Sequence, residues 1–520
     1  MRYIKESNLD AIIERALKLK GDNCKLNASD DANLLKMFFE DTHITMQFIG
    51  INRIQSMYLC MLKESYCQQS QRYVKVSEGE YFDLPFDKNS NVFKNYNFGK
   101  YCDIMDKLME LYDEMTPLKE SSLNKKGRKI AEDYVHGIPI EDARYILPLS
   151  CKTNINVTMT LKNLFNFYNI YLYSSIENYN TSLMPLFADI CSIVNNILDS
   201  ILEDTDSNIP TLDIIYRTTS SRNRDVYINS LDENFSFIRK SSDLYMGCDE
   251  VDNMLNNNMT AIIYPNDGLD KIALCALNSS SENPIETMNK SYNDSTKKTK
   301  LVERVIGYGH TSILEAVPII TETSLSFCAF HQLIRHRMLD IKMCNMKDLS
   351  EIYENPAYKV YLPDSISENE YFFNKFSEIY NELKEFRKNI PASLRMETFL
   401  NCDRMFFTSS SNLRAEVEIG QKRLCNNAQT EIRRLYEAKR YSMVAAFPFI
   451  AKQFTPGCAY GKCPEGKMTC CNPRLDFEES MFDIIHQRYD VEVCCENTPM
   501  RDRLVSYYTE HDDKYQGDIK

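Results

Sequence analysis

The sequence has no long apolar run. No stretch of about twenty consecutive apolar residues is present, and a membrane-spanning helix requires one, so we expect no membrane span and no membrane partner. The N-terminus also lacks the apolar stretch of a secretory signal peptide, because residues 1–6 turn polar at once. The 18 cysteines therefore predict reduced thiols in a cytoplasmic protein.

Basic residues are also fewer than acidic residues. The chain has 61 Lys and Arg against 74 Asp and Glu, a formal net charge of -13, which argues against binding a nucleic-acid polymer through phosphate neutralisation. Any anionic ligand must therefore be held by local arginines. The composition is otherwise that of a globular protein, with 43% hydrophobic and 26% charged residues. At 520 residues the chain is long enough for two or three domains.

Two halves of the sequence follow a similar plan. Residues 42–49 and 319–327 alternate apolar and polar side chains, which predicts a strand in each half. An apolar stretch follows each strand, and a long helix-like segment comes later, at about 158–201 and 412–445. We expect an internal duplication joined near residues 256–260.

A helix is also predicted for residues 301–308. It should stop at Gly309, because a residue without Cβ suits the end of a helix. A strand-like segment at 261–264 should open the second half.

A group of polar residues ends the apolar stretch of the second half: Gln332, Arg335, His336 and Arg337. In a helix, Gln332 and Arg335 would share a face, and guanidinium groups match the geometry of phosphate. The alternative is a solvated basic helix end. Upstream, residues 310–312 with Glu315 admit a helix-capping interpretation, in which Thr311 or Ser312 would satisfy donors of the first turn.

Together, these elements resemble the flavin-dependent thymidylate synthase family. The resemblance rests on residues 309–315, on Arg335-His336-Arg337 at the family's distance, and on the downstream segments 412–414 and 422–432. It covers about residues 260–435, with a weaker echo over about 30–200. It implies an α/β (α+β) fold with a central sheet flanked by helices, here in two fused copies. The expected domains are 1–258, 259–457 and a cysteine-bearing tail at 458–520.

The two halves depart from the family pattern in complementary ways. After Arg337 the family's closing serine-x-arginine-tyrosine is missing, whereas the first half supplies it as residues 70–73. In that half, Cys60-Met61-Leu62 replaces arginine-histidine-arginine. Arg144 matches a family arginine for which the second half has Met396, and Arg423 has only Tyr171 as its first-half counterpart. Each half has lost what the other keeps.

The resemblance therefore implies one composite site divided between the halves. FAD would be held by His310, Ser312, Glu315, Arg335, His336, Arg337, Asn412 and Arg414. A pyrimidine nucleotide would be held by Gln68, Ser70, Arg72, Arg144, Gln332 and Arg423, of which Ser70, Arg144 and Arg423 would serve catalysis. Alone, residues 70–73 also fit an ordinary polar loop.

The implied reaction is the reductive methylation of dUMP to dTMP. Methylenetetrahydrofolate would supply the carbon, and NADPH would reduce the flavin. Family sites lie between subunits of a homotetramer, so a homodimer of such pseudo-dimers is expected. Gln68 replaces a family glutamate and Asn427 a family histidine. Two alternatives therefore stay open: a flavin-dependent methylase of another pyrimidine nucleotide, and a non-catalytic homologue that binds flavin or nucleotide.

The C-terminal tail is dense in cysteine. Cys458, Cys463, Cys470 and Cys471 are candidate ligands of a structural zinc or an iron-sulfur cluster. Against a metal, adjacent Cys470 and Cys471 bind one ion poorly, and no doubled Cys-x-x-Cys occurs, so ordinary reduced thiols are the alternative. A similar tail, with Cys-Pro-Glu-Gly in it, occurs in some members of the family.

Overall fold

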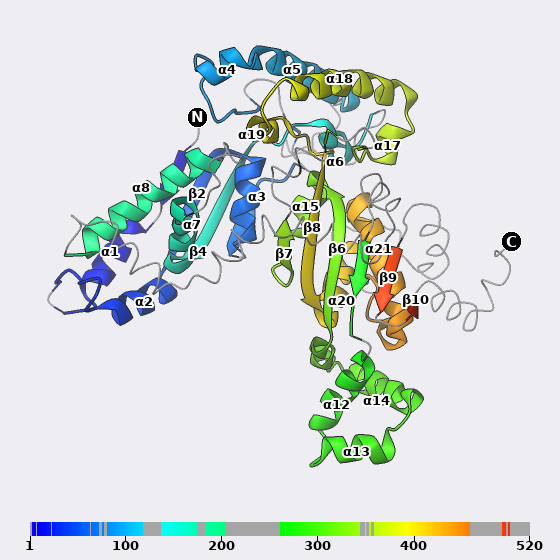
Figure 1. Cartoon of the computed structure of the whole chain (residues 1–520). Helices are drawn as coiled ribbons and strands as arrows, with labels where there is room; N and C mark the ends of the chain where they lie inside the picture. Colours follow the sequence, from blue (N-terminus) through cyan, green and yellow to red (C-terminus); the bar gives the residue numbers. More distant parts are fainter. Residues whose placement is uncertain are drawn as a thin grey trace, which may run out of the picture.

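Two sheets, one from each half of the chain, lie side by side in the computed structural model, with helices around both (Figure 1). The structure describes residues 3–6, 8–21, 23–62, 64–71, 75–76, 81–117, 137–173, 183–203, 260–265, 267–343, 349, 353–354, 358–457, 491–495 and 498–499. No helix in this described part is long and apolar enough to cross a membrane.

The first sheet has four strands in the order β1-β2-β4-β3. Its strands are β1 (Tyr3–Glu6), β2 (His43–Asn52), β3 (Ser65–Gln68) and β4 (Lys152–Thr160). Along β2 and β4, buried and more exposed residues alternate, because one face of the sheet packs on a core. The helices of this part are α1 (Leu9–Leu17), α2 (Ala32–Asp41), α3 (Arg53–Met61), α7 (Leu161–Tyr173) and α8 (Leu183–Ile201).

The second sheet has six strands in the order β10-β9-β5-β6-β8-β7. They are β5 (Thr260–Ile263), β6 (Pro318–Ser326), β7 (Asp340–Met343), β8 (Arg404–Asn412), β9 (Val491–Cys495) and β10 (Thr498–Pro499). Its helices are η4 (Thr311–Ala316), α15 (Phe327–Leu333), α20 (Leu413–Arg423), α21 (Thr430–Ala446) and η6 (Pro448–Ile450). A helical foot at the bottom of Figure 1 comprises α12 (Gly268–Asn278), α13 (Pro284–Ser291) and α14 (Ser295–Gly307).

Strand register confirms the duplication. The order β5-β6-β8-β7 repeats β1-β2-β4-β3. Ser65 of β3 lies opposite Thr158 of β4, and Asp340 at the start of β7 lies opposite Ser410 of β8. The last residues correspond too, since Gln68 faces Ile155 and Met343 faces Phe407. The chain therefore contains two copies of one α+β fold.

A third layer combines helices from both halves. Its members are α4 (Asn91–Asn95), α5 (Phe98–Met115), α6 (Ile140–Ala143), η2 (Arg144–Ile146), α17 (Asp364–Ser367), α18 (Glu370–Lys388), α19 (Ala392–Arg395) and η5 (Met396–Thr398). Helices α5 and α18 pack against each other at the top of Figure 1, where the rings of Phe98 and Phe386 are 5.4 Å apart. The halves thus share a hydrophobic core.

A backbone clamp joins the halves below this layer. Leu149 N donates to Phe399 O at 2.8 Å, and Asn401 N donates to Leu147 O at 2.8 Å. These reciprocal bonds flank an antiparallel bridge between Pro148 and Leu400. They fix the loop after η2 from the first half against the matching loop after η5 from the second.

The predicted strands at 42–49 and 319–327 are confirmed as β2 and β6. The prediction of one long helix at about 158–201 and another at about 412–445 was partly wrong. Residues 158–160 and 412 end strands β4 and β8, and each following segment contains two helices rather than one. The alternation of β4 continues directly into an apolar helix, which hides the boundary. Helix α14 ends at Gly307, and Gly309 has a φ of +87, as the predicted stop requires. The predicted join at 256–260 lies almost entirely outside the described residues.

Candidate active site

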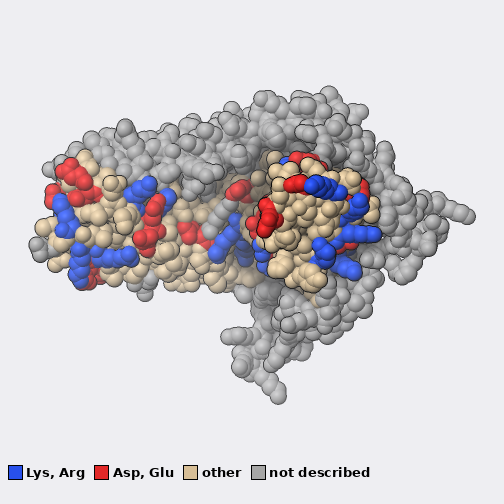
Figure 2. All heavy atoms as spheres, turned by 90° about the horizontal axis from the view of Figure 1, so that it is seen from below, with Lys and Arg blue, Asp and Glu red and all other residues tan. Residues whose placement is uncertain are grey.

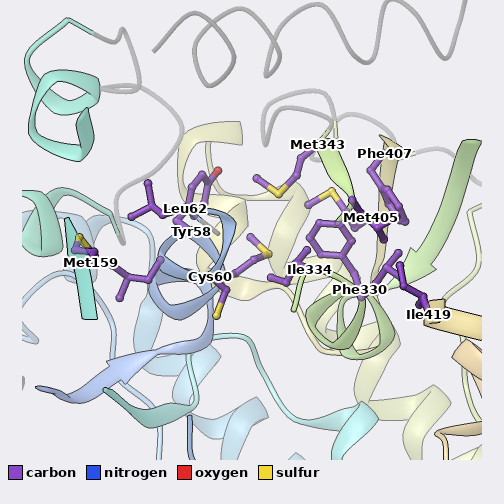
Figure 3. Packing of buried hydrophobic residues seen from close by; sticks show 14 of the residues in the cluster. Tyr58, Cys60, Leu62, Met159, Phe330, Ile334, Met343, Met405, Phe407 and Ile419 are labelled. Atoms are coloured by element: carbon purple, nitrogen blue, oxygen red, sulfur yellow. The ribbon is translucent and has the colours of Figure 1, made fainter. Parts of the chain in front are cut away.

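The two halves meet where α3 and α15 follow β2 and β6. Ser56 Oγ lies 3.0 Å from His331 Nε2, and Tyr66 OH donates to Ile334 O at 3.3 Å. Figure 3 shows the apolar part of this contact, where Cys60 and Ile334 come from different halves. Polar residues from each half are therefore held close to the other half by a packed interface.

Arg144 and Gln332, both predicted to bind the nucleotide, share a partner. Arg144 Nη2 donates to Gln429 Oε1 at 2.7 Å, and Gln332 Nε2 donates to the same oxygen. The Gln429 amide nitrogen in turn donates to Tyr145 OH. Because Arg144 opens η2, directly before the backbone clamp, its side chain reaches the second half. The composite arrangement is thus present for these two residues.

Glu431 extends this hydrogen-bond network through Tyr145. Its buried carboxylate accepts from Ser326 N and Tyr145 OH, each at 2.8 Å, and from Ser326 Oγ. Burial raises the pKa of Glu431, although the hydrogen bonds from Ser326 and Tyr145 favour the carboxylate. Ser326 also caps α15. One carboxylate therefore links α21, the start of α15 and η2.

Three arginines gather at the interface, and no described carboxylate forms an ion pair with them. Arg53 is 5% exposed, and its Nη1 donates to Gln71 Oε1. Burial lowers the pKa of Arg53 to about 10, and the positive charges of Arg144 and Arg335 act in the same direction. In the described part of the chain, no carboxylate lies within ion-pairing distance of Arg53, Arg144 or Arg335. Such a cluster favours binding of an anion.

The arginine-histidine-arginine element lies beyond its helix, because α15 ends at Leu333. Arg335 Nη2 donates to Gln68 Oε1 at 2.7 Å, so a predicted cofactor residue and a predicted nucleotide residue meet across the halves. Arg423 Nε donates to His336 Nε2 at 2.8 Å. Burial, together with the charge of Arg423, lowers the pKa of His336 to about 3, so this imidazole stays neutral. The guanidinium of Arg337 lies 5.5 Å from the centre of the Tyr66 ring.

The remaining predicted cofactor residues lie around η4 and the start of α20. Arg414 pairs with Glu315 at 2.6 Å and with Glu418 at 2.8 Å. Asn412 caps α20 by accepting from Ala415 N. His310 and Ser312 are exposed, and η4 has no side-chain cap, so the capping interpretation of this segment was wrong.

These residues fit an anionic cofactor such as FAD in part. Arg335 and Arg337 are exposed and have no carboxylate partner among the described residues, whereas Arg414 is neutralised by its two glutamates. Strand β7 begins opposite Ser410, two residues before Asn412. The start of β7 therefore lies near the end of β8 that carries Asn412.

Some predicted site residues lie outside the described part of the chain. They are Arg72 and the four tail cysteines, Cys458, Cys463, Cys470 and Cys471. Ser70 is half-buried just after β3. Within the described ranges, no group of at least three His, Cys, Asp or Glu side chains is placed to hold a metal ion.

On the face seen in Figure 2, acidic and basic side chains are interspersed.

Sequence reasoning missed several residues of the site. They are Arg53, Gln71, Tyr145, His331, Gln429 and Glu431. The signal for Arg53 was an arginine standing alone in the apolar segment after the first predicted strand. Gln429 and Glu431 were part of the motif that carries the resemblance, but their partners come from elements distant in sequence.

Comparison with known proteins places the chain in a family. A family model described as "Thymidylate synthase complementing protein" matches residues 35–176 and 262–449, one stretch in each half. A flavin-dependent thymidylate synthase from Clostridium tetani is 35% identical over 105 residues, covering 20% of this chain and 39% of that protein. One from Geobacter sulfurreducens is 26% identical over 180 residues, covering 33% of this chain and 76% of that protein. The chain thus spans about two fifths of the first relative's length.

Solved structures of related proteins match a similar share of the chain. Thymidylate synthase X from Helicobacter pylori, solved with FAD and dUMP, has a TM-score of 0.29 and 19% identity, covering 37% of this chain and 96% of that chain. The UMP/dUMP methylase PolB from Streptomyces cacaoi, bound with 5-Br dUMP, has a TM-score of 0.32 and 13% identity, covering 38% of this chain and 95% of that chain. Because the family match extends over more than half of its length, the chain belongs to the flavin-dependent thymidylate synthase family and carries two copies of that fold.

Proposed function

We propose that this chain reductively methylates a pyrimidine nucleotide, converting dUMP to dTMP at one composite site. The observation that carries the proposal is the meeting of Arg144 with Gln332 on Gln429, beside the arginine cluster that lacks a counter-charge. An anionic substrate would supply the missing charge. The co-substrates would be methylenetetrahydrofolate and NADPH, as in the family resemblance.

The residues of this chain would bind, orient and balance charge. Arg144 would donate to the nucleotide, where a fixed guanidinium stabilises negative charge developing on the pyrimidine ring. Ser70, Arg72 and Arg423 would contribute to the same nucleotide site. FAD would be held through Arg335, His336 and Arg337, with Asn412 and the His310–Glu315 segment beside them. When bound, the flavin supplies the redox chemistry of the reaction.

A neutral His336 suits a position beside a cofactor. Arg423 is the hydrogen-bond donor to His336 Nε2, and a protonated imidazole would repel that guanidinium. Burial and the charge of Arg423 lower the pKa of His336 to about 3, so at neutral pH its Nε2 is free to accept this hydrogen bond. This arrangement holds one candidate catalytic arginine without adding a further charge.

A second candidate function is methylation of a different pyrimidine nucleotide. Gln68 stands where the family has glutamate, and its side chain is engaged by Arg335, Ser56 and Thr153. An amide offers both a donor and an acceptor, whereas a carboxylate only accepts, so the sugar or base contacted at this position can differ. A ribonucleotide such as UMP is the corresponding test substrate.

The spectrum of the purified protein tests whether it is a flavoprotein. We expect a bound or added FAD to give a protein-associated flavin absorbance. Release of tritium from C5 of labelled dUMP, with methylenetetrahydrofolate and NADPH present, then tests the reaction, and labelled UMP tests the second candidate. A protein that stays colourless with added FAD would remove both enzyme functions and leave a non-catalytic homologue. In solution, sedimentation should report a dimer of this chain.

A further inference from the structure

Arg53 is a buried cation whose hydrogen bonds are incomplete. It is the first residue of α3, and its Nε has no hydrogen-bond partner among the described residues. Its Nη1 donates to Gln71 Oε1, and the Gln71 Nε2 is also buried without a partner. A buried donor without an acceptor is costly, and an uncompensated buried charge is costlier still. Two such donors, on side chains that are hydrogen-bonded to each other, point to an acceptor that the described residues do not provide.

The surroundings of Arg53 exclude an ordinary structural ion pair. Arg144 and Arg335 add positive charge, and no carboxylate in the described part of the chain pairs with Arg53. Burial raises the pKa of the neighbouring Cys151 thiol to about 12, so at neutral pH it is uncharged. The complement of this group is an anion with several acceptor oxygens, and a phosphate monoester fits guanidinium donors well.

We propose that Arg53 and Gln71 bind the phosphate of the nucleotide substrate. This inference rests on the proposed function for the identity of the ligand. Arg53 belongs to the half that has Cys60-Met61-Leu62 in place of arginine-histidine-arginine, so that half contributes an arginine of its own. Gln71 directly follows Ser70, which brings the phosphate to the loop already assigned to the nucleotide.

Binding of dUMP and of deoxyuridine to Arg53→Met tests this proposal. We expect the variant to bind dUMP about 10- to 100-fold more weakly, because a charge-assisted contact to phosphate is lost. Deoxyuridine, which lacks the phosphate, should bind as it does to the wild type. Arg53→Lys should recover part of the dUMP affinity. Arg304→Met on exposed α14 is the matched control and should bind both ligands like the wild type.

The melting temperature separates a binding role from a structural one. Without ligand, Arg53→Met should melt no lower than the wild type, because an uncompensated buried charge is removed. A lower melting temperature with equal losses for dUMP and deoxyuridine would overturn the proposal. If the wild type bound no nucleotide, the proposed function would fail. Inorganic phosphate should then still raise the melting temperature of the wild type but not of Arg53→Met, and equal shifts would reject the Arg53 site itself.

The duplicated fold also has equivalents of the nucleotide-site positions in the opposite halves. Met396 opens η5 as Arg144 opens η2, and Met343 closes β7 as Gln68 closes β3. Cys60 lies as many residues before the end of β3 as Arg335 lies before the end of β7, so Cys60 corresponds to Arg335. A second site would therefore have Met396 in place of Arg144, Met343 in place of Gln68 and Cys60 in place of Arg335.

These replacements belong to the hydrophobic core. Met343, Met396 and Cys60 are each at most 1% exposed and lie in the same apolar cluster, with Leu62 beside them. Figure 3 shows Cys60, Leu62 and Met343 within this packing. We infer that each chain has one nucleotide site and that the other site has become core. A dimer of chains would then carry two sites rather than four.

Equilibrium dialysis with dUMP measures the number of sites. Saturation at one nucleotide per chain is expected, and two per chain would overturn the inference. Met396→Arg provides a test that does not need a ligand, because an arginine introduced into core should lower the melting temperature by several degrees. Met37→Arg, at an exposed position on α2, is the matched control and should change little. An unchanged melting temperature for Met396→Arg would mean that the position is a polar site after all.

Discussion

The Arg144→Met variant is expected to lose almost all turnover while keeping its fold. Arg144 is 4% exposed and has no carboxylate partner among the described residues, so its charge is available to a ligand. Removing one buried donor to developing charge reduces kcat/KM by about 10²- to 10³-fold. We expect a loss of this size in tritium release from dUMP.

The fold should tolerate this change for two reasons. The corresponding position of the second half is Met396, which is 1% exposed, so the η2 turn accepts methionine. The Gln429 oxygen that Arg144 contacts would keep its hydrogen bond from Gln332. The other acceptor that loses a bond is the partly buried Glu141 carbonyl, to which Arg144 Nε donates at 3.1 Å.

The control for Arg144→Met is Arg304→Met, which removes the same chemical group from the surface of α14. Circular dichroism and the melting temperature should match the wild type for both variants. Flavin absorbance should also be retained, because Arg144 is assigned to the nucleotide. Turnover of Arg144→Met within threefold of the control would contradict the composite site, even with the family assignment intact.

The Asp403→Ala variant is expected to show the largest loss of stability. Asp403 is fully buried and accepts from Arg387 Nη2 at 2.6 Å, Tyr380 OH at 2.8 Å and Leu400 N at 2.8 Å. Burial alone would lower the pKa of Arg387, but the charge and hydrogen bond of Asp403, together with Tyr380 and Tyr358, outweigh it, and the net effect is a raised pKa. Breaking a buried pair from one side costs about 3–5 kcal/mol in the free energy of unfolding.

Urea denaturation of Asp403→Ala should show this loss as a lower midpoint. Glu382→Ala is a suitable control, because Glu382 pairs with Lys107 on the surface, where an ion pair contributes under about 1 kcal/mol. Asp403→Leu combined with Arg387→Met should recover part of the loss, because both buried charges are then removed. Similar midpoints for Asp403→Ala and Glu382→Ala would refute the assignment.

Asp403 also helps to position Arg144 of the proposed nucleotide site. It holds Leu400 N, and Leu400 forms the bridge to Pro148 in the clamp that follows η2. A looser clamp would displace Arg144. The nucleotide affinity of folded Asp403→Ala should therefore fall although Asp403 contacts no ligand.

The strands that carry the site could be predicted because alternation of apolar and polar residues is a local signal. Residues 42–49 and 319–327 show it, and β2 and β6 lie there. The complementary loss of motifs between the halves was also visible in the sequence, and the meeting of Arg144 with Gln332 and of Gln68 with Arg335 agrees with it. Helix ends were harder to predict, since α15 stops at Leu333 although no Gly or Pro follows to mark the end.

Sequence by itself determined the two-copy α+β fold and the residue types that each half offers to a nucleotide and a flavin. Tertiary structure alone decided that Arg53 joins the arginine cluster, that Gln429 and Glu431 link the halves, and that Cys60, Met343 and Met396 became core. The physical reason is that charge balance and burial depend on contacts between residues distant in sequence, such as Arg144 and Gln429, which no local pattern encodes.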